Sequence, residues 1–289
     1  MRGMRDRVQT RRDFRGLIGK EQGDVMAFFM TINGKRVEAN DGEMVLGAAR
    51  RAGIAIPTLC HHEAVEPFGS CRLCMVEVTK PEWKGWKGLM TACLYPCAPD
   101  LIVETDSERV HQVRRNVLDL LLARCPDAEL IQKLAAEYGV HQTSFMQREK
   151  PDKCILCGLC VRICETAATS AISTVQRGHD REIGTPWGEP PPDCIGCLAC
   201  AHVCPTGHIQ YEETGMTRMI WGRRFELQRC EKTGKPLPIT KEQAAFLAKR
   251  QNMNPNYLVT SADANRKQTA ETFARIARWN KLGMQQEVK

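Results

Sequence analysis

Two copies of one cysteine spacing constrain the fold of this chain more than any other feature. Each copy reads Cys-x2-Cys-x2-Cys-x3-Cys, and the eight cysteines are Cys154, Cys157, Cys160 and Cys164, then Cys194, Cys197, Cys200 and Cys204. Three thiolates on one tight loop hold three corners of a 4Fe-4S cluster, whereas the fourth cysteine of such a run binds the other cluster. The repeat therefore predicts a bacterial-type dicluster ferredoxin domain over residues 151–215.

The same rule predicts which cysteines share each cluster. One 4Fe-4S cluster would be bound by Cys154, Cys157, Cys160 and Cys204, and the other by Cys194, Cys197, Cys200 and Cys164. Glu165 follows the first copy where Pro205 follows the second, which is a small departure from the repeat. Structural zinc sites also use four cysteines at Cys-x2-Cys spacings. A structural zinc-binding interaction protein is therefore the alternative, although the repeated triple-cysteine run favours iron.

A second group of four cysteines lies nearer the N-terminus. Cys71 and Cys74 form a tight pair, with Cys60 before it and Cys93 after it. The first gap is longer than in the plant-type ferredoxin spacing, but the tight pair is kept. These four cysteines are predicted to bind one 2Fe-2S cluster, with zinc again as the alternative. Cys97 competes with Cys93 for the fourth place, and Cys93 is preferred because two prolines flank Cys97 and restrict its loop.

Local patterns around this second group predict a mixed helix and strand domain. Strand-like runs at 28–32 and 35–38 flank Asn33-Gly34, the pair that best tolerates the positive φ angles of a type I′ hairpin turn. Apolar residues at helical spacing predict a helix over 44–52, and residues 75–78 are typical of a returning strand. The sequence therefore predicts a compact α+β domain over residues 26–106.

The remaining segments have a helical pattern. Apolar residues follow the 3.6-residue period over 107–124, and Pro126 suits the first turn of a second helix that stops near Gly139. Residues 107–150 are therefore predicted to be a helical spacer. In the C-terminal tail, 216–289, Thr240 and Gln243 predict a capping box for one helix, and a second helix is expected around 270–277.

Charge and composition exclude several classes of protein. The net charge of +7 is uneven, because residues 216–289 carry net +9 and residues 26–215 carry net −5. The basic tail has no regular basic helix face, so a nucleic-acid partner is not expected. Thr10–Phe14 resembles the start of a twin-arginine signal, but charged residues follow it, so residues 1–25 are predicted to be a flexible leader. No apolar run reaches the roughly 18–20 residues that span a bilayer, and a cytoplasmic location without a membrane span is expected.

The cysteine groups carry a resemblance to a known family. Residues 28–105 resemble the 2Fe-2S domain that begins the large iron-sulfur subunit of respiratory complex I, and which recurs in NAD-linked hydrogenases and formate dehydrogenases. Residues 150–210 resemble the dicluster ferredoxin domain that follows it. The resemblance implies a β-grasp fold for the first domain. Many members bind an extra cluster between the two domains through one His and three Cys, but this chain offers only Cys125 there. The extra cluster is therefore expected to be absent.

The predicted clusters imply a relay of single electrons. Iron-sulfur centres exchange electrons without making or breaking substrate bonds, and the sequence offers no convincing dinucleotide fingerprint, phosphate loop or catalytic triad. We therefore expect an electron-transfer subunit of formate dehydrogenase or hydrogenase type, working between a flavin/NAD(H) subunit and a catalytic subunit. The tail would dock a partner. An independent ferredoxin-like carrier is the other alternative, and Cys97, Cys125 and Cys230 are predicted to be ordinary thiols.

Overall fold

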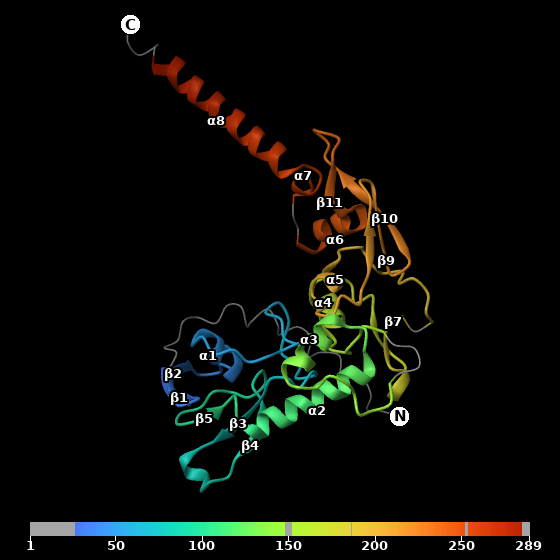
Figure 1. Cartoon of the computed structure of the whole chain (residues 1–289). Helices are drawn as coiled ribbons and strands as arrows, with labels where there is room; N and C mark the ends of the chain where they lie inside the picture. Colours follow the sequence, from blue (N-terminus) through green and yellow to red (C-terminus); the bar gives the residue numbers. More distant parts are fainter. Residues whose placement is uncertain (1–26, 148–151, 186, 252–253, 285–289) are drawn as a thin grey trace, which may run out of the picture. The chain divides into compact units, whose positions relative to one another are not determined.

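The chain is described by a computed structural model (Figure 1). It covers all residues except 1–26, 148–151, 186, 252–253 and 285–289. The leader expected at residues 1–25 therefore lies outside the described residues. The described chain divides into two compact units. The first contains the residues up to Thr58 together with Arg72–Arg114, and the second contains Leu59–Cys71 and the residues from Arg115 onward.

The first unit is built on a mixed five-stranded sheet with the order β2-β1-β5-β3-β4. Its elements are β1 (Ala27–Ile32), β2 (Lys35–Asn40), α1 (Val45–Arg51), β3 (Met75–Thr79), the short helix η2 (Pro81–Trp83), β4 (Gly88–Thr91) and β5 (Ile102–Glu104). The predicted hairpin turn is present, because Asn33 and Gly34 have φ angles of 50° and 77°. β1 pairs with β5 in parallel and with β2 antiparallel.

A single apolar core holds this unit together. Side chains from alternate positions of the strands meet α1, and Ile32, Val45 and Val76 are fully buried. Alternation along a strand sends every second side chain to the same face, so burial of that face fixes the register of the sheet. Cys74 and Cys93 belong to this core, which places two of the predicted ligands on a rigid support.

The division between the units falls within α2 (Glu108–Arg124). α2 and α3 (Glu129–Glu137) are the two helices predicted for residues 107–139. The prediction that Pro126 lies in the first turn of the second helix was wrong, because α3 begins three residues later and Ala128 occupies its N-cap position. Gly139 follows α3 with φ 78°, the left-handed conformation that commonly ends a helix.

The second unit carries the repeated cysteine motif on short elements. These are α4 (Leu159–Ala167), β6 (Ser173–Val175), the short helix η3 (Gly178–Asp180), β7 (Glu182–Gly184) and α5 (Ala199–His202). α4 and α5 pack against each other, and each begins just after the second cysteine of its motif. The repeat in the sequence is therefore a repeat in the structure.

The residues after 210 form a second sheet before the C-terminal helices. An antiparallel sheet with the order β11-β10-β9-β8 comprises β8 (Tyr211–Glu213), β9 (Thr217–Ile220), β10 (Arg223–Arg229) and β11 (Pro236–Thr240). The helices are α6 (Lys241–Gln251), α7 (Pro255–Leu258) and α8 (Ala262–Met284). Both predicted tail helices are present, but the four strands were not predicted.

The start of α6 shows how much of the predicted capping box forms. The Gln243 N–H donates to the Thr240 hydroxyl at 3.0 Å, which satisfies one of the free donors of the first helical turn. The Gln243 side-chain oxygen Oε1 is buried and has no hydrogen-bond partner, so the reciprocal half of the box is not made. Among the described residues, none of the helices combines the length and apolar character needed to span a bilayer.

Candidate metal centres

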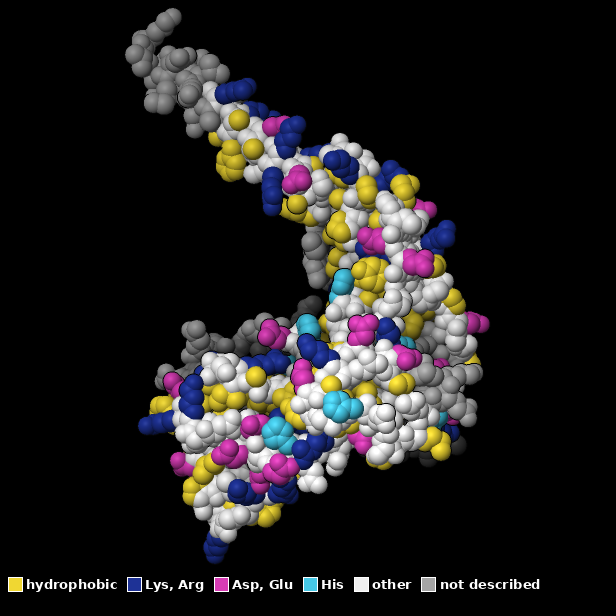
Figure 2. All heavy atoms as spheres, in the orientation of Figure 1, with side chains coloured by type: hydrophobic (Ala, Val, Ile, Leu, Met, Phe, Trp, Pro, Cys, Tyr) yellow, Lys and Arg dark blue, Asp and Glu magenta, His cyan; other side chains and the backbone are white. Residues whose placement is uncertain are grey.

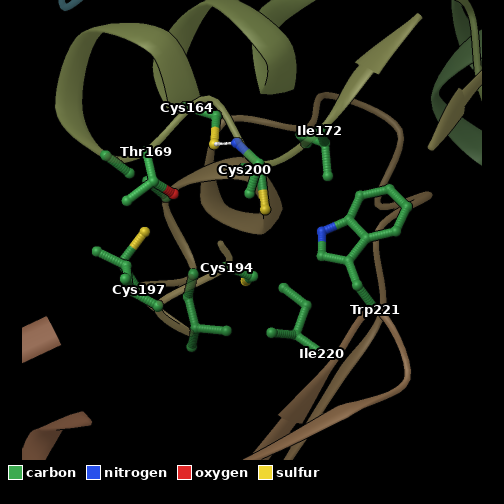
Figure 3. Close-up of a pocket in the computed structure, with 13 residues that line it drawn as sticks. Cys164, Thr169, Ile172, Cys194, Cys197, Cys200, Ile220 and Trp221 are labelled. Carbon is green, nitrogen blue, oxygen red and sulfur yellow. Dashed lines mark hydrogen bonds between the residues drawn. The ribbon is translucent and has the colours of Figure 1, made fainter. Parts of the chain in front are cut away.

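The eight cysteines of the repeat gather into two groups of four, and each group lines its own pocket. Ile195, Ile220 and Trp221 help to line the first pocket and Ile183 and His208 the second. Figure 3 shows the first pocket, with sulfur atoms of the labelled cysteines facing a common space. The first pocket contains Cys164, Cys194, Cys197 and Cys200. The second contains Cys154, Cys157, Cys160 and Cys204. These are the two sets predicted from the rule that the fourth cysteine of each copy joins the cluster of the other copy.

The loops reach this arrangement through left-handed turns at equivalent positions. Leu156 and Gly196 are each two residues after the first cysteine of their copy, with φ angles of 52° and 66°. Gly158 and Leu198 occupy the next equivalent pair, with φ angles of 71° and 63°. Glycine adopts such angles freely, whereas leucine is strained there. Each copy thus has one glycine and one leucine in left-handed conformation, in opposite order.

These turns aim backbone donors at the cysteine sulfurs. The Leu156 N–H donates to Cys154 Sγ, and the Gly196 N–H donates to Cys194 Sγ, each at 3.4 Å. The Ala171 N–H donates to Cys164 Sγ at 3.3 Å, which is the dashed line in Figure 3. Donors at sulfur stabilise the negatively charged thiolate form. A cluster held by thiolates fits loops that present N–H groups in this way.

In each copy, an arginine side chain donates a hydrogen bond to the backbone carbonyl of the first cysteine. The Arg124 side chain donates to the Cys154 carbonyl and the Arg223 side chain to the Cys194 carbonyl, each at 2.9 Å. A positive charge beside a group of thiolates offsets part of their mutual repulsion. Sequence reasoning did not find these arginines, because both lie outside the motif that they support.

The second sheet is fastened directly to the loop of the second copy. Arg218 is 3% exposed, and its guanidinium donates to the Gly196 carbonyl at 2.7 Å and forms an ion pair with Glu213 at 2.6 Å. The Thr240 hydroxyl donates to the Ile195 carbonyl at 2.5 Å. The sheet therefore covers the Cys194–Cys200 loop.

In the absence of iron, burial raises the pKa of five cysteines of the two pockets, which are Cys154, Cys157, Cys160, Cys194 and Cys200. Desolvation is the largest cause in each case, and it raises the pKa of Cys157 and Cys200 to about 11 and that of Cys160 to about 12. Nearby cysteines raise these values further. Iron binding needs thiolates, so a bound cluster would replace these protons. Among the described residues, no group of three or more His, Cys, Asp or Glu is already drawn together closely enough to hold a single metal ion.

The four cysteines predicted for the 2Fe-2S cluster are found as two close pairs. In the second unit, the Cys71 N–H donates to Cys60 Sγ at 3.3 Å, and the hydrogen bond between the two thiols and burial raise the pKa of Cys60. In the first unit, Cys74 Sγ lies 3.4 Å from Cys93 Sγ. Cys97 instead donates its N–H to the Glu43 carbonyl at 2.7 Å, and burial raises its pKa to about 11.

The two remaining cysteines, Cys125 and Cys230, differ in the direction in which the pKa of the thiol is shifted. Cys125 donates its S–H to the Leu121 carbonyl at 3.0 Å, and burial raises its pKa to about 12. Cys230 directly follows β10, and its Sγ accepts a hydrogen bond from the Ser261 N–H at 3.2 Å. Hydrogen bonds from Thr233 and from the Ser261 N–H lower the pKa of Cys230 to about 6. Neither cysteine lines the two pockets.

Comparison with known proteins defines the class of this chain. Residues 27–108 match the family described as a 2Fe-2S iron-sulfur cluster binding domain, and residues 153–208 match the 4Fe-4S dicluster domain. A chain in the crystal structure of an NAD+-reducing [NiFe]-hydrogenase in the H2-reduced state is 30% identical, with a TM-score of 0.54. The likeness covers 63% of this chain and 86% of that chain. The chain therefore belongs to the iron-sulfur proteins that combine a 2Fe-2S domain with a 4Fe-4S dicluster domain.

Several curated relatives are subunits of NADH- or NADPH-linked oxidoreductases and hydrogenases. The mitochondrial NADH-ubiquinone oxidoreductase 78 kDa subunit of Neurospora crassa is 29% identical over 70% of this chain and 29% of its own length. The NADPH-Fe(3+) oxidoreductase subunit alpha of Geobacter sulfurreducens is 32% identical over 62% of this chain and 24% of its own length. The NADP-reducing hydrogenase subunit HndD of Solidesulfovibrio fructosivorans is 32% identical over 64% and 36%, respectively. The chain thus spans about a quarter to a third of the length of these relatives.

Proposed function

We propose that the chain is an electron-transfer subunit that relays single electrons through one 2Fe-2S and two 4Fe-4S clusters. The observation that carries this proposal is the gathering of each predicted set of four cysteines around one pocket. Bound there, each cluster would supply reversible one-electron exchange. The residues of this chain hold the clusters, exclude water with isoleucine side chains and present backbone N–H groups to sulfur. The relatives named as NADH or NADPH oxidoreductases and as hydrogenases support this function.

The ligands proposed for the 2Fe-2S cluster are Cys60, Cys71, Cys74 and Cys93. The close contact of Cys74 Sγ with Cys93 Sγ supports Cys93 as the fourth ligand. Cys97 lies in a loop whose neighbour Pro96 bridges to Met44, and its N–H is used by the Glu43 carbonyl. The mixed sheet of the first unit supports the β-grasp assignment of this domain.

A hydrogen-bonded contact joins the loop that carries Cys60 to a 4Fe-4S motif. The Arg162 guanidinium donates to the Cys60 carbonyl at 2.8 Å and to the Cys157 carbonyl at 3.5 Å. Ser70 Oγ donates to the Leu156 carbonyl at 3.3 Å. Cys60 and Cys157 are proposed ligands of different clusters, so a single side chain contacts the backbone of both. This contact supports electron transfer between those two clusters within the chain.

The partners proposed are a flavin/NAD(H) subunit and a catalytic subunit of hydrogenase or formate dehydrogenase type. The NAD+-reducing hydrogenase and the NADP-reducing hydrogenase among the similar proteins favour the hydrogenase type. For docking, we propose the C-terminal helices, where Tyr257, Phe273 and Ile276 are 68%, 66% and 51% exposed. Figure 2 shows hydrophobic and basic side chains next to each other along the C-terminal helix. Apolar anchors with a basic surround suit a partner surface of acidic character.

The test is anaerobic purification of the native complex from its source through a tag on this chain. We expect about ten irons per chain, one 2Fe-2S and two 4Fe-4S signals in electron paramagnetic resonance spectra of the reduced protein, and co-purifying flavin and catalytic subunits. Zinc in place of iron would contradict the relay itself. Ten irons without any partner would instead indicate an independent carrier.

A further inference from the structure

The pocket lined by Cys164, Cys194, Cys197 and Cys200 contains one side chain whose position the cysteine motif does not explain. Trp221 follows β9 and reaches into this pocket, where Figure 3 shows its indole nitrogen facing the space between the cysteines. The Nε1 atom is buried and makes no complete hydrogen bond in the described structure, although the indole N–H is directed at Cys200 and lowers the pKa of that thiol against the larger effect of burial. An indole N–H is a donor only, and a buried donor without an acceptor is costly. The arrangement indicates that an acceptor belongs in the pocket.

The backbone conformation at Trp221 also indicates a functional role for this residue. Trp221 and Gly222 are the two central residues of the turn between β9 and β10, with φ angles of 54° and 72°. A type I′ turn with two positive φ angles normally has Asn-Gly at these positions. Tryptophan is strained there, and such strain is concentrated at functional sites. A side chain that only filled space could be placed without this strain.

The turn is held firmly over the pocket. Arg223, the next residue after the turn, donates to the Cys194 carbonyl at 2.9 Å, and Arg218 on β9 donates to the Gly196 carbonyl at 2.7 Å. Ile172 and Ile220 line the same pocket and are 4% and 2% exposed. A donor fixed in such an apolar wall interacts strongly with a charge that develops beside it, because little water is present to screen the interaction.

We propose that Trp221 donates its Nε1–H hydrogen bond to Cys200 Sγ when the 4Fe-4S cluster is bound, and thereby raises the reduction potential of that cluster alone. The inference rests on the function proposed above. Reduction adds one negative charge to the cluster and its sulfur ligands, and a hydrogen-bond donor stabilises the more negative form. The pocket of the other 4Fe-4S cluster has Thr206 and His208 as its polar side chains besides the cysteines. The two clusters therefore differ in the donor that the chain supplies.

The experiment compares the full chain with Trp221→Phe, purified anaerobically and titrated under electron paramagnetic resonance detection. Phenylalanine keeps an aromatic cover but lacks the N–H. We expect the reduction equilibrium of one 4Fe-4S cluster to become less favourable by about tenfold, which is about 59 mV for a one-electron couple, while the other cluster stays unchanged. Trp187→Phe is the matched control, since Trp187 is 86% exposed, and all its potentials should equal those of the wild type.

A second variant separates the hydrogen bond from packing. Benzothienylalanine incorporated at position 221 has the shape of tryptophan with sulfur in place of the N–H, and it should lower the same potential in a fully loaded protein. An unchanged potential in this variant, or an equal shift of both 4Fe-4S clusters, would overturn the role of Trp221. A wild-type chain with no second 4Fe-4S signal would overturn the relay as well, so the two failures are distinguishable.

Discussion

At the scale of single residues, the two cysteine loops differ in the glycine that each uses. Gly196 has φ 66°, and a Cβ atom there would lie 2.8 Å from the Phe225 ring and 3.0 Å from the Thr240 methyl group. Gly158 has φ 71°, but a Cβ there would meet only Arg162 Nε at 4.0 Å. Both glycines permit a left-handed turn. Only Gly196 also allows a sheet to pack directly onto its loop.

This difference gives a matched pair of variants. Gly158→Ala should cost about 1–2 kcal/mol of folding free energy, because alanine is strained at positive φ. Gly196→Ala should cost about 1–3 kcal/mol more, because the added methyl group overlaps Phe225. Chemical denaturation of the two cluster-loaded variants measures both values. Phe225→Leu in the Gly196→Ala background should recover part of the additional loss, and equal costs for the two glycines would contradict the packing argument.

Arg162 is a second residue with a testable role. Its guanidinium donates to the Glu66 carbonyl at 2.5 Å as well as to the carbonyls of Cys60 and Cys157, and it lies over the Phe68 ring. Arg162→Met keeps much of the stem and removes these charged hydrogen bonds, each of which is worth about 1.5–3 kcal/mol. We expect amide hydrogen exchange across residues 60–70 to accelerate by about tenfold or more.

The control for Arg162→Met is Lys133→Met, since Lys133 is an exposed residue of α3. Mass spectrometry of exchange in the full chain should show no change over residues 60–70 in this control. Unchanged exchange in Arg162→Met would show that other contacts hold the loop. Sequence analysis could not find this role, because Arg162 stands between two cysteines of the motif, and its partners Cys60 and Glu66 are 102 and 96 residues away in the chain.

At the scale of elements, the sequence predicted those parts whose signal is local. The hairpin at Asn33-Gly34 and the helix that begins after Thr240 depend on turn and cap residues beside them in the chain, and both are present. The sheet of β8–β11 was missed for physical reasons. Its first two strands have only three and four residues, and its turn at Trp221-Gly222 lacks the Asn-Gly signal. The parallel pairing of β1 with β5 likewise depends on contacts far apart in sequence.

The same limit applies to the candidate site. Cysteine spacing predicted the two groups of four because the ligand chemistry fixes that spacing. The side chains that support the groups, such as Arg124, Arg218 and Trp221, come from other elements with no motif of their own. Their positions follow from how α2 and the second sheet pack onto the cysteine loops, and that packing is visible only in three dimensions.

Cys230 links β10 to the start of α8 and gives a prediction about pH. Its pKa is lowered to about 6, whereas an unfolded cysteine has a pKa of about 8.5. A lowered pKa contributes stability that is complete above the unfolded value and is lost as the pH falls through the folded value. The wild type should therefore exceed Cys230→Ala in melting temperature by more at pH 8.5 than at pH 5.5.

Cys125→Ala is the control for this pH dependence. Burial raises the pKa of Cys125 to about 12, so its thiol stays neutral in the folded chain over the same range. Between pH 5.5 and about 7.5, the difference in melting temperature between the wild type and Cys125→Ala should therefore not change with pH. Thermal unfolding of the three proteins in matched buffers provides the comparison. A difference for Cys230→Ala that does not change with pH would show that its thiol is not ionised in the folded chain.

At the scale of the whole molecule, the charge distribution and the fold divide the tail into two parts. Residues 216–289 carry net +9, and they were predicted from sequence to dock a partner. The strands of the tail have a different role in the structure. β9, β10 and β11 cover the Cys194–Cys200 loop through Arg218, Arg223 and Thr240. The exposed aromatic side chains of the tail, Tyr257 and Phe273, lie on α7 and α8 instead. Cluster support and docking should therefore be separable along the chain.

Two truncations of the chain in its native complex test this separation. Ending the chain after Thr269 keeps Ala264, which packs against Cys230, but removes Phe273 and Ile276. This protein should retain all three cluster signals and lose most of its co-purifying partner, because buried apolar anchors carry most interface energy. Ending the chain at Gly215 removes Arg218, Trp221 and Thr240, and should also abolish the signal of the 4Fe-4S cluster proposed for Cys194, Cys197 and Cys200. Full partner binding by the longer truncate would refute docking through α8, and three intact clusters in the shorter one would refute the supporting role of the sheet.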